Sequence, residues 1–137
     1  MILVDTSVII NYLKGIENTK AMILEQIIEK KIPYGIASYT YQEVLQGARD
    51  EIEFYKLKMY LSTQTVYFLP EEICVYDEAA ELYFSLRRKG ITIRSIIDIN
   101  IALIAVKNKL YLLHDDADFS RITKEFYDLK ILEASLL

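Results

Sequence analysis

The chain has very little cysteine and histidine: Cys74 and His114 are the single examples in 137 residues. One cysteine cannot form an internal disulfide, which fits a reducing compartment, and we expect Cys74 to be a small buried hydrophobe. Zinc sites in proteins are built mainly from cysteine and histidine, so this composition excludes a structural zinc site.

Long apolar runs and net positive charge are also missing. No stretch approaches the roughly 20 apolar residues of a membrane-spanning helix. The first residues carry no basic segment and reach Asp5 at once, so we expect no secretory signal and a cytoplasmic protein. The formal charge of −4 argues against a protein that simply coats nucleic acid, because phosphate contacts drive such binding. It is compatible with an enzyme whose excess carboxylates are offset by bound cations.

Short apolar runs alternate with helical patterns along the chain. We expect one domain over residues 1–137, because this length suits one core. Strands are predicted at 2–4, 34–37, 66–69, 110–113 and 129–132. Helices are predicted at 18–31, 71–90 and 95–109, and another follows the strand at 34–37, with Ser38 as a candidate cap and Glu43 about one turn into it. In the helix at 71–90, Ile73, Tyr76, Ala80 and Tyr83 recur at helical spacing, and Asn18 is the expected cap of the helix at 18–31. The alternation predicts an α/β fold with a mainly parallel central sheet flanked by helices on both faces.

Four acidic residues stand where predicted strands end or predicted helices begin. They are Asp5, Glu43, Asp98 and Asp116. Sites in such folds form beyond the carboxyl ends of the strands, so we expect these side chains to converge. Asp98 is the most informative, because an unpaired charge in a helix rich in isoleucine is costly to bury. Taken singly, each acid also fits a structural role as a cap, a turn residue or an exposed helix residue.

Four neighbouring carboxylates repel one another, so such a site persists when divalent cations occupy it. Ligands that are all oxygen suit Mg²⁺ or Mn²⁺, which keep several waters and act on phosphate esters. One ion can activate water while a second, roughly 4 Å away, stabilises the leaving oxygen. Thr6 or Ser7 can ligate an ion or orient a water bound to it, and both also suit the start of a helix.

The segments LVDTSVIINYL, YQEVLQGA, DINIALIA and LLHDDADF resemble, in order, the four motifs of PIN domains, and especially of VapC-type toxins of type II toxin–antitoxin pairs. The resemblance implies a three-layer α/β/α fold and a Mg²⁺- or Mn²⁺-dependent endoribonuclease that cleaves single-stranded regions of tRNA, rRNA or mRNA. It implies that the four acids carry the metals, Glu43 directly or through water. It also implies a VapB-type antitoxin that covers the acidic site, and a homodimer.

One departure from the motifs concerns the last ligand. Many relatives have threonine or serine where this chain has His114, and the following Asp115, Asp116 and Asp118 offer a choice. We align Asp116 as the ligand because Asp118 and Phe119 match the pair that closes the motif. Asp118 is the second choice, as an outer residue of the site or a helix cap.

Cations that precede Asp98 are candidates for substrate binding. They are Arg87, Arg88, Lys89 and Arg94. They form a plausible track for phosphates, although basic residues at the end of a helix are also favoured by its dipole. His114 can touch substrate, assist proton transfer, or be a hydrogen-bonded structural residue.

Two other functions compete with the nuclease. An aspartate-based phosphatase of the haloacid dehalogenase type needs a second aspartate two positions after the nucleophile, where this chain has Ser7. A non-catalytic interaction module with the PIN fold is expected to lose at least one of the four acids, and all are present.

Overall fold

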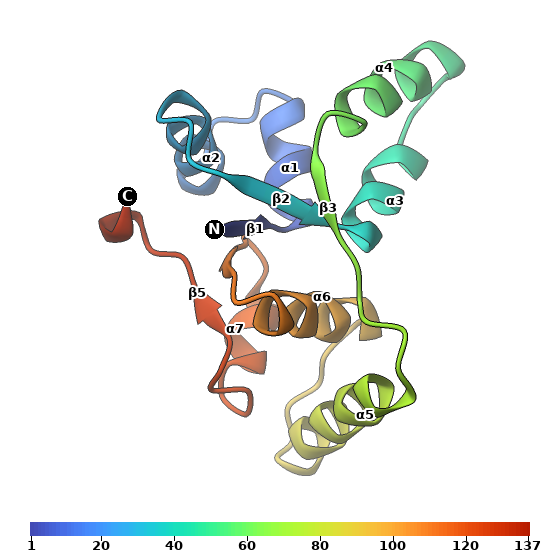
Figure 1. The fold of residues 1–137 in the computed structure, drawn as a ribbon, viewed down its shortest axis with the longest axis vertical. Helices are drawn as coiled ribbons and strands as arrows, with labels where there is room; N and C mark the ends of the chain where they lie inside the picture. Colours follow the sequence, from blue (N-terminus) through green and yellow to red (C-terminus); the bar gives the residue numbers. More distant parts are fainter.

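A five-stranded parallel sheet runs through the middle of the computed structural model, which describes residues 1–137 (Figure 1). The strands are β1 (Ile2–Val4), β2 (Tyr34–Ala37), β3 (Thr65–Tyr67), β4 (Tyr111–Leu113) and β5 (Lys130–Ile131). Their order across the sheet is β3-β2-β1-β4-β5, and all four pairings are parallel. The predicted α/β architecture is confirmed: β1 and β2 have the predicted bounds, and the ends of β3, β4 and β5 differ from the predicted ranges by at most two residues.

Helices connect the strands, and none is long and apolar enough to cross a membrane. They are α1 (Thr6–Leu13), α2 (Thr19–Glu29), α3 (Ser38–Gln46), α4 (Glu51–Leu61), α5 (Ile73–Arg88), α6 (Ile96–Lys107), α7 (Ala117–Ile122) and the short 3₁₀ helix η1 (Ala134–Leu136). Asn18 caps α2 as expected, with its side chain accepting the Ala21 N–H at 2.8 Å. Ser38 is the first residue of α3 and not its cap, since Ala37 occupies that position.

Strand side chains alternate between two apolar cores, one on each face of the sheet. Leu3 of β1 and Leu112 of β4 pack with α5, α6 and α7, whereas Val4 and Leu113 pack with α1 to α4. Figure 1 shows the two helical layers above and below the sheet. Because the three central strands are covered on both faces, they are apolar runs without alternating polar residues, as read from the sequence, whereas the edge strands β3 and β5 carry the exposed Thr65 and Lys130.

Helix α5 buries only part of the apolar stripe noted in its sequence, since Tyr83 packs against the core. Ile73 and Tyr76 are exposed, whereas Val75 and Leu86 are buried against α6 and its neighbours. The segment is a helix, as its pattern predicted, but it carries two apolar stripes, and only the packing of the neighbouring elements decides which stripe is buried. Cys74 lies on the exposed side next to Glu72, so the expectation of a buried cysteine is wrong.

Candidate active site

The order of the strands reverses between β1 and β4, and in parallel sheets such a reversal forms a crevice beyond the carboxyl ends of the two strands. From β1 the chain moves outward to β2 and β3 at one edge, and it then returns to β4 and β5 at the other. Ligands bind at such a reversal, beyond the carboxyl ends of the two central strands. Asp5 directly follows β1 and Asp116 begins α7 after β4, so both stand at this point. The Asp5 N–H donates to the Leu113 carbonyl at 2.9 Å, which joins the two strand ends.

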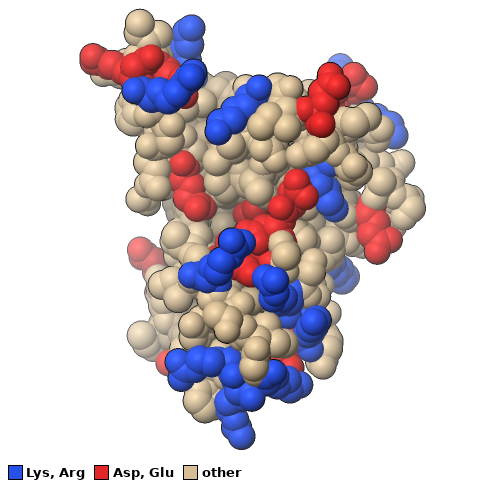
Figure 2. All heavy atoms as spheres, turned by 180° about the vertical axis from the view of Figure 1, so that it is seen from behind, with Lys and Arg blue, Asp and Glu red and all other residues tan.

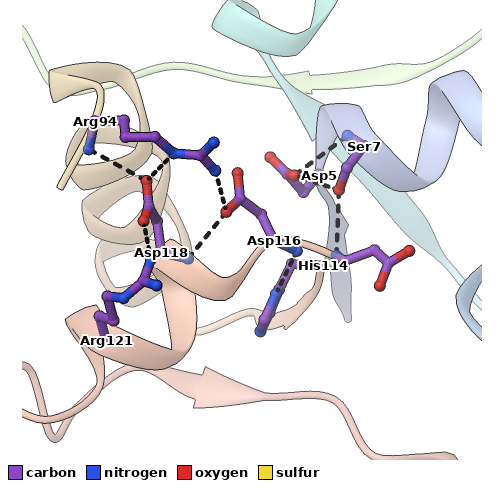
Figure 3. A network of polar contacts seen from close by, with 8 residues as sticks. Asp5, Ser7, Arg94, His114, Asp116, Asp118 and Arg121 are labelled. Atoms are coloured by element: carbon purple, nitrogen blue, oxygen red, sulfur yellow. Dashed lines mark hydrogen bonds and ion pairs between the residues drawn. The ribbon is translucent and has the colours of Figure 1, made fainter.

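Asp5 is a buried carboxylate without a cationic partner. It caps α1, and its Oδ2 accepts the N–H of Ser7 at 3.2 Å and the Ser7 hydroxyl at 2.8 Å (Figure 3). The Ser7 oxygen in turn accepts the Asp115 N–H at 3.2 Å. Burial outweighs these hydrogen bonds and raises the pKa of Asp5 from 3.8 to about 6, and the Glu43 charge adds to the rise.

Asp98 is half-buried and has no hydrogen bond or ion pair with any other side chain. It lies in the first turn of α6, which begins after Ser95, whose hydroxyl accepts the Ile97 N–H at 3.1 Å. The following residues of α6 are buried, and this apolar surrounding holds the carboxylate away from water. Burial raises the pKa of Asp98 to about 7, and repulsion from Asp5, from Asp116 and from the other nearby acids adds to it.

Asp116 and Asp118 lie next to Asp98, and one carboxylate oxygen of each of the three falls within 4.8 Å of the others. Asp116 caps α7: its Oδ1 accepts the Asp118 N–H at 2.9 Å and a guanidinium N–H of Arg94 at 3.2 Å. Asp118 is fully buried, and it accepts bonds from the N–H and Nε of Arg94, at 3.2 and 3.4 Å, and from Arg121. Burial opposes ionisation of Asp118, but these hydrogen bonds outweigh it and lower its pKa.

Glu43 approaches from the opposite helical layer. Its Oε1 accepts the Thr6 hydroxyl at 2.8 Å, and Thr6 shares a further hydrogen bond of 3.0 Å with the buried Thr40. The charge of Glu43 raises the pKa of both Asp5 and Asp98, so it faces the same space. The four acids predicted from the sequence therefore lie around one crevice, with one arginine on its rim.

His114 lies behind the crevice rather than in it. Its ring is buried, packs on Phe119 with ring centroids 5.1 Å apart, and accepts the Asp116 N–H at Nδ1 over 3.2 Å. Burial lowers the pKa of His114, with the Lys20 charge as a second cause, so the ring is neutral at pH 7. This geometry gives His114 a structural part in the turn that carries Asp116.

The other predicted cations lie at the end of α5, away from the acids. Arg87 and Arg88 are exposed and lie over the rings of Tyr83 and Phe84, and Lys89 pairs with Glu125. Figure 2 shows acidic side chains gathered in the middle of the rear face and basic side chains gathered toward the end of the molecule where α5 lies. A cavity of about 620 Å³ between α1, α3 and α4 contains none of the four acids.

Sequence reasoning did not include Arg121, which contacts Asp118 one helical turn away. The spacing of three residues between Asp118 and Arg121 is the signal that could have found this pair.

The donor set fits a hard divalent cation. Every nearby donor is a carboxylate or hydroxyl oxygen, and Asp5 and Asp98 are close to one another without a lysine or arginine to neutralise them. Mg²⁺ and Mn²⁺ prefer such ligands. A cation at this point would remove the repulsion that raises both pKa values.

Comparisons with known proteins concern the family and the fold of the chain. A family model described as PIN domain matches residues 2–125. Ribonuclease VapC11 of Mycobacterium tuberculosis is 29% identical over 125 residues, which cover 90% of this chain and 92% of that protein. The crystal structure of VapBC2 from Rickettsia felis bound to a DNA fragment from their promoter is similar with a TM-score of 0.73 and 22% identity, over 96% of this chain and 98% of that chain. The structure of VapBC-1 from nontypeable Haemophilus influenzae is similar with a TM-score of 0.72 and 23% identity, over 98% and 99%.

Proposed function

The chain belongs to the PIN domain family, and from this premise we propose that it is a divalent-metal-dependent endoribonuclease, the toxin of a toxin–antitoxin pair. Its substrates are single-stranded regions of RNA. One observation carries the proposal: Asp5, Glu43, Asp98 and Asp116 surround one crevice, and Asp5 and Asp98 have no cationic partner there. The name of the relative Ribonuclease VapC11 supports the activity.

Asp5, Asp98 and Asp116 would hold the metal, and Glu43 would join them directly or through a water molecule. A divalent cation bound there supplies a Lewis acid that lowers the pKa of water and stabilises charge on the phosphate oxygens during hydrolysis. Of Asp116 and Asp118, Asp116 is the better metal ligand because its Oδ2 has no hydrogen-bond partner. Both oxygens of Asp118 are engaged by Arg94 and Arg121.

The remaining residues orient these carboxylates. Ser7 holds one oxygen of Asp5, Oδ2, through two hydrogen bonds. Thr6 holds one oxygen of Glu43 through a single hydrogen bond. Such hydrogen bonds would orient the two carboxylates toward the crevice. No serine, cysteine or histidine is required as nucleophile or base.

Basic residues at the end of α5, away from the acids, would bind the RNA backbone. Arg87, Arg88 and Lys89 extend the exposed positive surface from α5, and we propose that they contact phosphates on one side of the cleaved bond. The partner that we propose for the chain is a VapB-type antitoxin, since the structures similar to it include VapBC proteins. We also propose that the chain forms a homodimer.

Cleavage of RNA by the purified chain tests the activity. We expect total RNA to be cut with Mg²⁺ or Mn²⁺, and the cutting to stop with chelator and in Asp5→Ala and Asp98→Asn variants. Asp77→Asn removes one exposed carboxylate from α5, away from the four acids, and serves as the control that keeps activity. Cleavage that persists in both site variants would reject the proposal. A chain that binds metal without cutting RNA would indicate the interaction module instead.

A further inference from the structure

Arg94 is the one lysine or arginine that forms an ion pair with Asp116. Its terminal guanidinium nitrogen lies 3.2 Å from Asp116 Oδ1, and its side chain is 75% exposed. Figure 3 shows the guanidinium between Asp116 on one side and Asp118 on the other. The two contacts differ in kind, because Asp118 is fully buried and also accepts the backbone N–H of Arg94.

Asp118 acts as the anchor of this arrangement. One of its oxygens accepts the N–H and Nε of Arg94, and the other accepts Arg121. Since the backbone of Arg94 is held, this residue stays at the rim of the crevice even when its guanidinium moves. Only the end of the side chain is free to change partners.

The contact between Arg94 and Asp116 is easily exchanged. It is a single hydrogen bond to an oxygen that already accepts the Asp118 N–H, and ion pairs this exposed to water are weak. A divalent cation bound at the free Oδ2 of Asp116 would offset the negative charge that holds the guanidinium at Oδ1 and would repel the guanidinium.

We propose that Arg94 is a displaceable counter-ion, which neutralises Asp116 in the metal-free chain and is released by the divalent cation to bind an RNA phosphate. This inference rests on the metal site of the proposed function. An exposed guanidinium pairs readily with phosphate through two parallel hydrogen bonds. The exchange makes RNA binding depend on metal binding, so that the chain engages phosphate through Arg94 only when the site is loaded.

The affinity for Mn²⁺ tests the first half of the exchange. Titration by calorimetry at pH 7.5 and low salt compares the unmodified chain with Arg94→Gln and Arg94→Lys. The charge-matched control is Lys30→Gln, on the exposed end of α2. We expect Arg94→Gln to bind Mn²⁺ about tenfold more tightly, because a competing positive charge is gone. Arg94→Lys should stay close to the unmodified chain, and the control should change less than twofold.

Weaker or unchanged Mn²⁺ binding in Arg94→Gln overturns the inference, because Arg94 would then orient Asp116 for the metal instead of competing with it. Failure of the unmodified chain to bind Mn²⁺ would contradict the metal site itself, and with it the proposed function. The two failures are therefore distinguishable. Thermal melting in EDTA, compared with the unmodified chain, verifies that Arg94→Gln is folded.

Binding of a labelled 2′-O-methyl single-stranded oligonucleotide tests the second half. Fluorescence anisotropy is measured in Mn²⁺ and in EDTA, and a gel of the same samples verifies that the probe is intact. We expect Arg94→Gln to weaken binding about fivefold in Mn²⁺ and to leave it unchanged in EDTA, where Asp116 retains the guanidinium. An equal loss in both conditions overturns the release step, since Arg94 would then contact phosphate whether or not metal is bound.

Discussion

Replacing Asp98 by asparagine should stabilise the metal-free chain while it abolishes metal binding. The pKa of Asp98 is raised from 3.8 to about 7, chiefly because burial disfavours its charged form. The folded chain therefore retains a proton that the unfolded chain loses between pH 4 and pH 7. The free energy of unfolding then falls as the pH rises through this range and stays low above it. Asparagine does not titrate, so in the variant this position no longer lowers the free energy of unfolding as the pH rises.

The size of the effect follows from the same shift. The rise in the pKa of Asp98 from 3.8 to about 7 means that folding disfavours the ionised carboxylate by roughly 4 kcal/mol, at about 1.4 kcal/mol for each pKa unit. Asp98 is only half-buried, and water screening leaves about 2 kcal/mol of this as a difference in stability. In a chain of this length that difference raises the melting temperature by about 6 °C at pH 8, and by little at pH 4.

Thermal and urea unfolding in EDTA at pH 4, 6 and 8, followed by circular dichroism, measure the effect. Asp77→Asn is the control for loss of an exposed carboxylate. Added Mg²⁺ should stabilise the unmodified chain by about 3 kcal/mol at 100 times its dissociation constant and should leave Asp98→Asn unchanged. Parallel pH profiles for the two chains, or a less stable variant at pH 8, would refute the reasoning.

Three further predictions concern the supports of the site. Asp118→Asn should cost about 2 kcal/mol in urea unfolding because a neutral amide replaces the buried carboxylate that accepts hydrogen bonds from Arg94 and Arg121, and an unchanged midpoint would contradict this. Gly35→Ala should cost about 2 kcal/mol in the same assay, since a Cβ there would lie 2.6 Å from the Thr65 carbonyl; a neutral change would show that the sheet relaxes. Thr6→Val should lower the cleavage rate about tenfold by freeing Glu43, whereas Thr6→Ser should keep it.

The fold and the positions of the acids could be predicted because local patterns determine them. Each of the three central strands is a short apolar run covered on both faces, and such runs are visible without tertiary information. Asp5 follows one of these runs directly, so its place at the sheet edge follows from the strand itself. Parallel strands carry such residues to a common edge, and this also brings Asp116 to the crevice.

The ion pairs around Asp118 could not be predicted, because they depend on how separate segments approach one another. Arg94 reaches Asp118 across 24 residues of chain, and no local pattern records that distance. The expectation that Cys74 is buried was wrong for the same reason, because the sequence does not show which face of α5 is covered. Two apolar stripes on one helix have equal helical periods, and only the position of α6 decides which is covered.

The pairing of β1 with β4 delays the assembly of the crevice during synthesis of the chain. The hydrogen bond from Asp115 to Ser7 joins residues 108 positions apart, and Val4 pairs with Leu113 in the sheet. A nascent chain that has not yet released β4 and α7 from the ribosome therefore has Asp5 and Glu43 but no complete set of acids. The repulsion that Asp116 and Asp118 exert on Asp98 arises only at this late step, when most of the core is already available to hold the carboxylates together.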